Sequence, residues 1–408
     1  MVSIQGEIHV RRNNQINWSS VSLDEEIYPG DMLRTSNNSR AAVVLINESI
    51  LRINQKSTLF FPEQETEQPF LLKVINGVIH IFSHRPRALK VITPFVNGAV
   101  EGTEFLVQVD PDKASISVFK GLVAAFNKHG RLDISSGQTI VAEKDAAPKY
   151  LAVIRPRDAT HWTLYYPEII ESSSSPSDTD SAPSFVRKAA DQLAVGQVKE
   201  AQANIAKALE KEPGNSDGLA LQAIIMIVQN QKEKALSHAT KAVEIDPQSP
   251  SANMALSYAL QANFDINGAL TTLQNASSSN PGNALIKARL AELWLSVGEL
   301  EKALSTAQEA VDLNSDIGRT QTVLGFAYLT QIKTVQAQAA FKRAITLDQA
   351  LPLARLGLGL AKIRNGDLEE GRSDIEIAAA LDPGNSLIRS YLGKSFYEEK
   401  RDKRAQEH

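Results

Sequence analysis

The feature that most constrains this chain is a 34-residue period in its C-terminal half. Small residues recur at that interval in two series. The first series is Ala201, Ala235, Ala269, Ala303, Ala337 and Gly371, and the second, seven residues further on, is Ala208, Ala242, Ala276, Ala310, Ala344 and Ala378. A fixed period of this length predicts an array of helical pairs in which each pair stacks on its neighbours.

The spacing within each repeat explains why these residue types are used. Residues seven apart lie on one face of a helix, and alanine at both positions lets the adjacent helix come close. A larger side chain would overpack that contact at a cost of roughly 1–3 kcal/mol. Pro-Gly-Asn at 213–215, 281–283 and 383–385 predicts the end of one helix, a turn, and a side-chain cap for the next helix.

This array resembles the tetratricopeptide repeat family over about residues 182–408, as six repeats and the first helix of a seventh. The small position of the family's first helix is filled by Ala189, Ala223, Ala291, Gly325, Gly359 and Gly393. Ser257 departs from that pattern. The resemblance implies a right-handed α-solenoid with a concave groove that holds peptides or partner helices.

In that family the concave wall comes from positions 2, 5, 9 and 12 of each first helix. The partner-binding residues that the resemblance implies at these positions are Ile224, Ile227, Met254, Tyr258, Glu292, Leu295, Arg319, Phe326, Leu329, Leu356 and Leu360. The wall is largely apolar, which suits an amphipathic helix or an extended apolar segment. The alternative is that the chain's own continuation, or tight superhelical packing, covers part of this surface.

Two tests follow from this assignment of the groove and of the alanine series. Ala303→Trp is expected to lower helical stability strongly, whereas Glu292→Ala is not. Phe326→Glu is expected to abolish partner capture without unfolding the chain.

Residues 1–150 have a different pattern, with short runs rich in Val, Ile and Phe between turn-forming residues. This pattern predicts an all-β sandwich or roll. Asn76-Gly77, which lies between two apolar runs, predicts a two-residue hairpin. The expected fold class is therefore multidomain β + α, with an N-terminal all-β domain followed by the α-solenoid.

Four short motifs occur in order within this β region: 28–35, 91–94, 100–105 and 119–121. Together they resemble the FecR domain, an envelope β-domain named for an iron-dicitrate regulator, over about residues 5–145. The resemblance implies sensory or scaffolding work in the bacterial envelope. In the regulator this domain follows a transmembrane helix and a cytoplasmic anti-sigma segment. This sequence shows neither, so sigma-factor control is not carried over.

Structural roles are the preferred interpretation of the residues within these motifs. Asp31 is expected to bond backbone amides of its own turn. Gly102 is expected to allow a bend or bulge in a strand.

The predicted domains are 1–150, the β-domain; 151–170, an aromatic latch segment; 171–184, a flexible linker rich in serine, proline and acid; and 185–408, the solenoid. The latch contains Trp162, Tyr165 and Tyr166, which are expected to pack against the β-domain. Its alternative role is a recognition surface.

Composition excludes several classes of function. The chain has no cysteine, which excludes disulfides and thiolate chemistry. Residues 1–170 are electrically balanced and no basic stripe stands out, so nucleic acid is not an expected partner. No apolar run reaches the roughly 18 residues of a membrane span. The first ten residues read as a strand instead of an export signal, and the natural protein is expected to continue past residue 408.

The search for catalytic groups finds none that converge. His80 and His84 lie in a strand pattern, roughly 13 Å apart, which is too far for one metal ion. Glu101 and Glu104 have no marked partner, and Gly393-Lys394-Ser395 lacks the upstream glycine of a phosphate loop. We therefore expect no enzyme, catalytic residue, metal or cofactor.

The sequence as a whole favours a non-enzymatic protein–protein interaction scaffold of the bacterial cell envelope or periplasm, with a cytoplasmic location left open. One alternative is a FecR-type signal-transduction regulator that senses an envelope receptor. The other is a cell-wall or polysaccharide binder that acts through Trp18, Trp162, Tyr165 and Tyr166. Partner identity and oligomeric state stay open.

Overall fold

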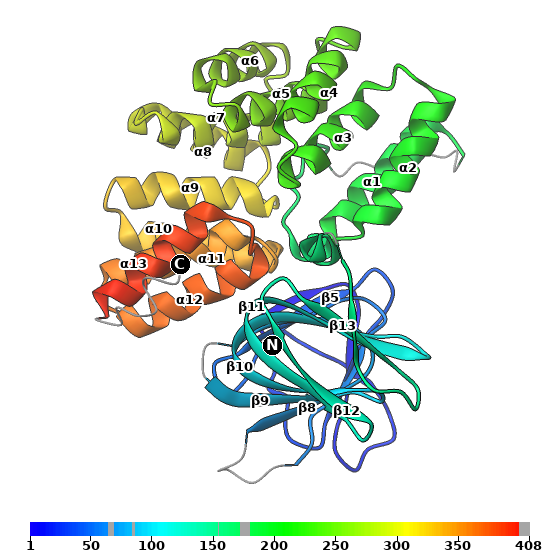
Figure 1. Ribbon diagram of the computed structural model, residues 1–408. Helices are drawn as coiled ribbons and strands as arrows, with labels where there is room; N and C mark the ends of the chain where they lie inside the picture. The colour runs from blue at the N-terminus through cyan, green and yellow to red at the C-terminus, as the bar shows by residue number, and fades with distance from the viewer. Residues whose placement is uncertain (64–68, 84–85, 154, 172–179, 400–408) are drawn as a thin grey trace. The chain divides into compact units, whose positions relative to one another are not determined.

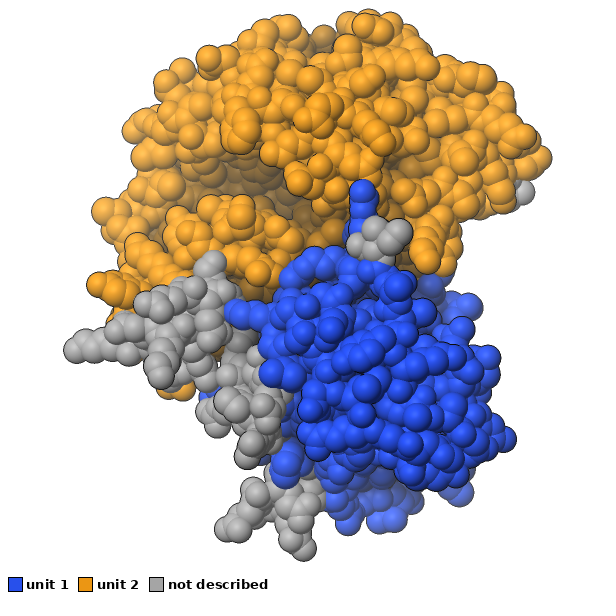
Figure 2. Space-filling view, viewed as in Figure 1, with its two compact units in different colours: residues 1–163 blue, residues 164–408 orange. Residues whose placement is uncertain are grey.

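The computed structural model describes residues 1–63, 69–83, 86–153, 155–171 and 180–399. The chain divides into two compact units, Met1–Thr163 and Leu164–His408. We call them the β unit and the helical unit, and Figure 2 colours them separately. The division falls inside the segment 151–170. Most of the predicted linker, residues 172–179, lies outside the described residues.

The β unit is built from short and long strands followed by one 3-10 helix. Its elements are β1 (Ser3–Gln5), β2 (Ile8–Arg11), β3 (Ser19–Ser20), β4 (Met32–Thr35), β5 (Arg40–Val44), β6 (Ile50–Ile53), β7 (Thr58–Phe60), β8 (Phe70–Phe82), β9 (Pro86–Ile92), β10 (Asn97–Val109), β11 (Lys113–Asn127), β12 (Gly130–Ser135), β13 (Thr139–Glu143), β14 (Lys149–Leu151) and η1 (Pro156–Thr163).

All of these strands belong to one hydrogen-bonded network, whose main path runs β14-β13-β11-β10-β9-β8-β7-β4-β2-β3. The long strand β8 pairs with four others, namely β6, β7, β9 and β10. Only its pairing with β9 is parallel among the described pairs. The strands curl around an interior, as Figure 1 shows. One buried cluster of mostly Val, Ile, Leu and Ala side chains forms the core. The prediction of an all-β domain is confirmed.

The predicted hairpin at Asn76-Gly77 is wrong, because β8 runs through both residues without turning. Gly77 has a φ of +100°, and a Cβ placed on it would lie 2.2 Å from Ser57 Oγ. The pairing of β8 with β7 shifts register beside this point. The Asn-Gly pair therefore makes an irregularity inside a strand, where only glycine fits.

Two structural roles expected in the β unit are present. The Asp31 carboxylate is buried and accepts hydrogen bonds from the backbone N–H of Tyr28 (2.9 Å) and Asn13 (3.0 Å). Arg12 Nη1 donates to the same carboxylate at 2.7 Å. The β10–β11 ladder is irregular between Glu101 and Glu104, which agrees with the bulge expected at Gly102.

The helical unit contains thirteen α-helices within its described residues. They are α1 (Ala182–Ala194), α2 (Val198–Lys211), α3 (Ser216–Val228), α4 (Lys232–Ile245), α5 (Pro250–Ala262), α6 (Ile266–Ser279), α7 (Ala284–Ser296), α8 (Leu300–Leu313), α9 (Gly318–Thr330), α10 (Thr334–Leu347), α11 (Pro352–Arg364), α12 (Leu368–Leu381) and α13 (Ser386–Glu398). They make six stacked pairs and one further first helix, which confirms the solenoid prediction (Figure 1). None of the described helices is both long and apolar enough to span a membrane.

Both series of small residues lie in the contacts between helices, and every member is buried. The backbones of α11 and α12 approach each other closely at two glycines. A Cβ on Gly359 would lie 2.5 Å from the Gly371 carbonyl oxygen, and a Cβ on Gly371 would lie 2.6 Å from the Gly359 carbonyl oxygen. Residues without side chains are therefore required at this point of the seam.

The helix caps predicted at the turns between repeats are present where the sequence has a proline before the turn. Asn215, Ser249, Asn283 and Asn385 cap their helices by accepting a hydrogen bond from a backbone N–H in the first turn. In the two repeats without the proline, the N-cap positions of α9 and α11 are Ile317 and Leu351, which make no side-chain cap. The cap and the proline therefore occur together in this array.

Candidate functional site

The predicted groove residues lie on the first helices α3, α5, α7, α9 and α11. They fall into two groups by exposure. Ile224, Met254, Arg319 and Leu356 are buried, whereas Ile227, Tyr258, Glu292, Leu295, Phe326, Leu329 and Leu360 are half-buried. The half-buried group retains surface that a partner can reach.

Three of these residues meet in one charged cluster. Arg319 forms a two-pronged pair with Glu292, through Nε to Oε1 at 2.9 Å and Nη2 to Oε2 at 2.8 Å. Arg289 adds a bond from Nη1 to Glu292 Oε2 at 3.0 Å. Both guanidinium groups lie against the Tyr258 ring, with their Cζ atoms 3.8 Å (Arg289) and 5.4 Å (Arg319) from its centroid. The cluster therefore fixes the position of Arg319 on the concave face.

The cluster keeps its charges in spite of burial. Burial by itself would raise the pKa of Glu292, but Arg319 and Arg289 outweigh it and hold that pKa below its ordinary value. Burial also opposes the charge of Arg319, yet Glu292 raises the pKa of Arg319 above its ordinary value. From sequence, Glu292→Ala is not expected to lower helical stability strongly. The structure favours the opposite prediction, since this carboxylate pairs with two buried cations.

Arg289 was not among the predicted residues, because it occupies repeat position 6 and not one of the family's wall positions. It is nonetheless 97% buried and bonds Gln261 as well as Glu292. A long cation one turn before Glu292 on an otherwise apolar helix is the sequence signal that could have found it.

A stretch of the chain itself packs against several of the predicted groove residues. The segment Leu164–Glu171, which we call the strap, has no regular secondary structure and packs against several repeats. Arg319 Nη1 donates to the Glu168 carbonyl at 3.2 Å, and Arg187 Nη1 donates to the Glu171 carbonyl at 2.9 Å. The Glu171 carboxylate accepts from the backbone N–H of Ala284 (3.0 Å) at the start of α7.

The side chains of the strap fill apolar sites of the solenoid. Tyr166 and Ile169 are 5% and 2% exposed and belong to the same buried cluster as Met254 and Leu285. Tyr165 packs on the cluster that contains Phe341, and its burial raises its pKa well above the ordinary value. The strap precedes the repeats in the sequence, and it packs against several of the residues predicted to line the groove.

The predicted latch divides between the two units. Trp162 is 8% exposed within the β unit, and its carbonyl accepts a 2.8 Å bond from Arg40 Nη1. Tyr165 and Tyr166 belong to the helical unit. Because Trp162 and Tyr166 are buried, two of the four aromatics that the polysaccharide alternative requires lack an exposed ring face for a sugar.

Among the described residues, a second part of the predicted groove surface contains a cavity. A cavity of about 290 Å³ lies among α9, α11 and α13, and its apolar lining comes from Leu329, Leu360, Ile363 and Tyr391. Exposed Arg364 and Lys394 also line it, together with Glu398. The cavity brings together two predicted groove residues, Leu329 and Leu360. It is large enough for one or two apolar side chains of a partner.

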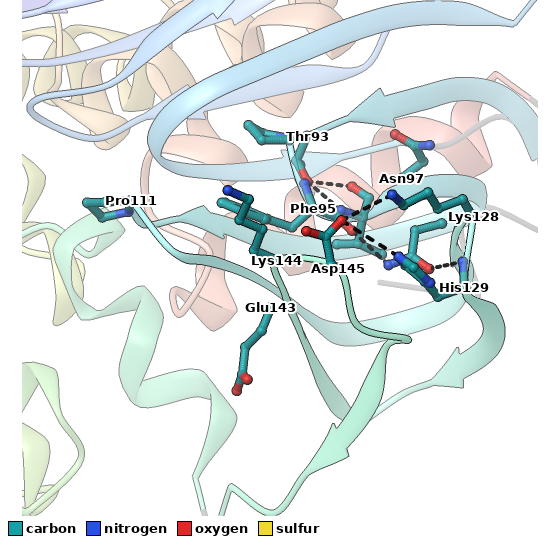
Figure 3. A pocket seen from close by; sticks show the side chains of 12 residues that line it. Thr93, Phe95, Asn97, Pro111, Lys128, His129, Glu143, Lys144 and Asp145 are labelled. Carbon is teal, nitrogen blue, oxygen red and sulfur yellow. Dashed lines mark hydrogen bonds and ion pairs between the residues drawn. The ribbon is translucent and has the colours of Figure 1, made fainter.

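The β unit has a larger cavity, of about 570 Å³, lined by four segments that connect strands (Figure 3). Its polar groups mostly hold these segments in place. Asn127 Nδ2 donates to the carbonyls of Phe95 (3.0 Å) and Ala146 (2.7 Å). Lys128 pairs with Asp145 at 3.1 Å and lowers the pKa of that carboxyl group. Figure 3 shows Lys128 and His129 both directed at Asp145. These hydrogen bonds and ion pairs hold the connecting segments together, so the polar side chains around the cavity have a structural role.

A buried histidine and carboxylate lie close together elsewhere in the β unit. His80 Nε2 is 3.3 Å from Glu104 Oε1, and Arg157 Nη1 from η1 is 3.4 Å from the same oxygen. Burial lowers the pKa of His80 below its ordinary value. His84 lies outside the described residues. Within the described part of the chain, no three metal-ligating side chains gather at one point.

Comparisons with known proteins agree with this division of the chain. The family model described as FecR protein matches residues 31–124. The model described as tetratricopeptide repeat matches residues 186–250, 327–386 and 356–406. No curated protein matches the chain.

Solved structures resemble each part separately. One is a protein of Parabacteroides distasonis provisionally assigned as an anti-sigma factor, with 16% identity, a TM-score of 0.29, and coverage of 33% of this chain and 67% of that one. Human IFIT1 has 17% identity, a TM-score of 0.46, and coverage of 55% and 57%. Yeast Tom70 has 17% identity, a TM-score of 0.38, and coverage of 56% and 48%. The chain thus spans about half the length of the last two.

The matched regions define an adaptor class, built from modules for protein interaction or signalling. Tetratricopeptide repeats indicate protein partners, and both modules are typical of non-catalytic proteins. The chain carries a FecR domain followed by C-terminal tetratricopeptide repeats, which confirms both resemblances found in the sequence.

Proposed function

We propose that this protein is a non-enzymatic scaffold of the bacterial cell envelope, whose helical unit binds a segment of a partner protein on its concave face. The observation that carries the proposal is the open apolar cavity lined by Leu329, Leu360, Ile363 and Tyr391, beside a strap that already lies on the same face. Surfaces of this kind bind peptides by taking apolar side chains into preformed pockets. The FecR domain supports the envelope location.

The proposed binding residues have different tasks. Half-buried Ile227, Tyr258, Leu295, Phe326, Leu329 and Leu360 meet the partner directly. Buried Ile224, Met254 and Leu356 form the layer beneath, and Glu292 with Arg319 supplies a fixed hydrogen-bond donor.

Site-specific photocrosslinking in cells tests this proposal. A photoreactive phenylalanine analogue at Leu360 should give a discrete crosslinked product, which mass spectrometry identifies. The matched control places the analogue at Lys342, an exposed position on the second helix α10. Products that are equal at both positions, or absent at Leu360, would remove the concave face as the binding surface. Fractionation of the same cells should place the protein in the envelope fraction.

A second candidate function is a signalling regulator, which the FecR match at residues 31–124 favours. In this case the β unit would contact an envelope receptor. The photoreactive analogue at Tyr150, which is 53% exposed, distinguishes the two. A receptor captured from Tyr150, with no product from Leu360, would favour the regulator over the scaffold.

A further inference from the structure

The strap occupies a surface suited to an extended peptide, and its contacts describe the peptide that this surface accepts. We propose that the strap stands in for a partner segment: the surface beneath it also binds an extended segment of another protein that carries two adjacent aromatic residues, an aliphatic residue and a carboxylate, in that order. Such a segment must displace the strap. The inference rests on the proposed function and names the partner's chemistry.

Main-chain contacts give the surface affinity for any extended segment. Arg319 and Arg187 each donate to a strap carbonyl, those of Glu168 and Glu171. Arg319 is held in place by Glu292, which receives two of its donor nitrogens, so its third nitrogen is directed before a peptide arrives. A donor fixed in advance loses little conformational freedom when the peptide binds.

Side-chain contacts determine which peptide fits. Tyr165 and Tyr166 enter apolar clusters of the solenoid, and Ile169 is 98% buried in the cluster that holds Tyr166. The Glu171 carboxylate meets two backbone N–H groups at the start of α7, those of Ala284 (3.0 Å) and Leu285 (3.4 Å). A helix N-terminus favours negative charge, so an acidic residue at this place is preferred over a neutral or basic one.

The strap is suited to exchange because it is held by side chains and a few hydrogen bonds, without belonging to a helix or a sheet. Leu164, Tyr165, Pro167 and Ile170 are only half-buried, and the Glu168 side chain is exposed. A segment in the same chain acts at an effective concentration in the millimolar range. A separate peptide of equal quality therefore binds the intact protein weakly, until the strap is weakened.

Fluorescence anisotropy with the full chain tests the inference. The probe is a fluorescein-labelled synthetic peptide with the sequence of residues 162–171, and a scrambled peptide of the same composition is its control. The wild-type chain should bind the probe weakly. The double variant Tyr165→Ala/Ile169→Ala should bind it at least tenfold more tightly, because its own strap no longer competes.

Two further variants make the test specific. Glu168→Ala lies in the same strap but removes only an exposed side chain and keeps the carbonyl that Arg319 uses, so probe affinity should equal that of the wild type. Adding Arg187→Ala to the double variant should weaken probe binding severalfold, because Arg187 donates to the last peptide carbonyl. Circular dichroism should give the same helix content for all of these chains.

Several results would overturn the inference. They are equal probe affinity in the wild type and the double variant, no binding to either, or equal binding of the scrambled peptide. A double variant that forms a dimer in light scattering would assign the surface to a second copy of this chain instead. If Leu360 still crosslinks a partner in cells, any of these results removes the strap inference and leaves the proposed scaffold function standing.

Discussion

Positions that accept only a small residue recur regularly along the helical unit, whereas in the β unit they are isolated. In the solenoid, buried small residues recur every 34 residues, from Ala201 to Gly371. In the β unit, long strands bend where isolated glycines allow it, as at Gly77 beside Ser57. In the solenoid, a large residue is not tolerated at any position of the repeated helix contact. In the β unit, the effect of a larger residue depends on the one neighbour that it meets, such as Ser57 at Gly77. Substitutions should therefore have regular effects in one unit and local effects in the other.

Ala303→Trp should produce the largest change, because Ala303 is fully buried in the seam between helices. Overpacking of this kind costs roughly 3 kcal/mol or more for so large an increase in volume. Urea denaturation followed by circular dichroism at 222 nm measures the loss. Glu301→Trp is the matched control, since Glu301 is exposed on the same helix α8. Equal losses would contradict the assignment of the alanine series to helix contacts.

Glu292→Ala should destabilise the helical unit by about 3 kcal/mol, because it leaves Arg319 and Arg289 buried without their shared carboxylate. Asp316→Ala is the control. It removes the exposed pair with Arg343, for which less than about 1 kcal/mol is expected. The fluorescence of Trp294, in a chain whose other two tryptophans are phenylalanine, reports unfolding of this unit. Similar losses in both variants would show that the cluster has no special role.

Gly77→Ala should destabilise the β unit by roughly 2 kcal/mol, through a strained backbone together with a clash. The control is Gly137→Ala. Gly137 also has positive φ, +84°, but a Cβ there would meet nothing within 4 Å. The stability lost in Gly137→Ala therefore measures the backbone strain alone, and it should be smaller than the loss in Gly77→Ala. The fluorescence of Trp162, in a chain with Trp18 and Trp294 replaced by phenylalanine, follows the β unit. Equal losses of stability in the two variants would show that the clash with Ser57 contributes nothing.

Acidification should weaken the two units in different pH ranges. Burial lowers the pKa of His80 below its ordinary value of 6.5, opposed in part by Glu104, with Arg52 and Arg157 lowering it further. As pH falls below 6.5 the unfolded chain gains a proton that His80 in the folded unit does not accept, so this group lowers stability by at most about 1.4 kcal/mol per pH unit. Burial lowers the pKa of His161 in the same unit as well. His80→Phe should therefore reduce the slope in urea titrations between pH 7.5 and 5.5, and His161 accounts for a remainder.

The helical unit should keep its stability throughout that range. Glu292 has a lowered pKa in the folded state, so its contribution is present above the ordinary value of 4.5 and is lost as pH falls through the folded pKa. Parallel weakening of both units between pH 7.5 and 5.5, as seen by Trp162 and Trp294 separately, would contradict this separation.

The solenoid could be predicted because its contacts are local. Ala201 and Ala208 pack between helices that are adjacent in the sequence, so one period contains all the information for a helix pair. The caps follow for the same reason, since Asn283 accepts from Ile286, three residues away. Small residues and turn residues at fixed spacing are therefore sufficient to place every helix.

The sheet and the strap depend on partners far away in the sequence. Asn76-Gly77 has the composition of a hairpin, but Ser57 and the partner strands of β8 keep the strand continuous. Glu171 meets Ala284, 113 residues away, and the Glu168 carbonyl meets Arg319, 151 residues away. No local sequence pattern predicts such contacts. The groove positions could be predicted from the repeat register, whereas the strap that packs against them is known only from the three-dimensional structure.

The strap also changes how the repeats can come apart. A stack of repeats in which each one touches only its neighbours can fray from either end, one pair at a time. Here one short stretch of chain ties the first helix, the fourth repeat and the fifth repeat to each other through Arg187, Ala284 and Arg319. We therefore expect the repeats that this segment joins to unfold together, and loss of the segment to let them unfold one pair at a time.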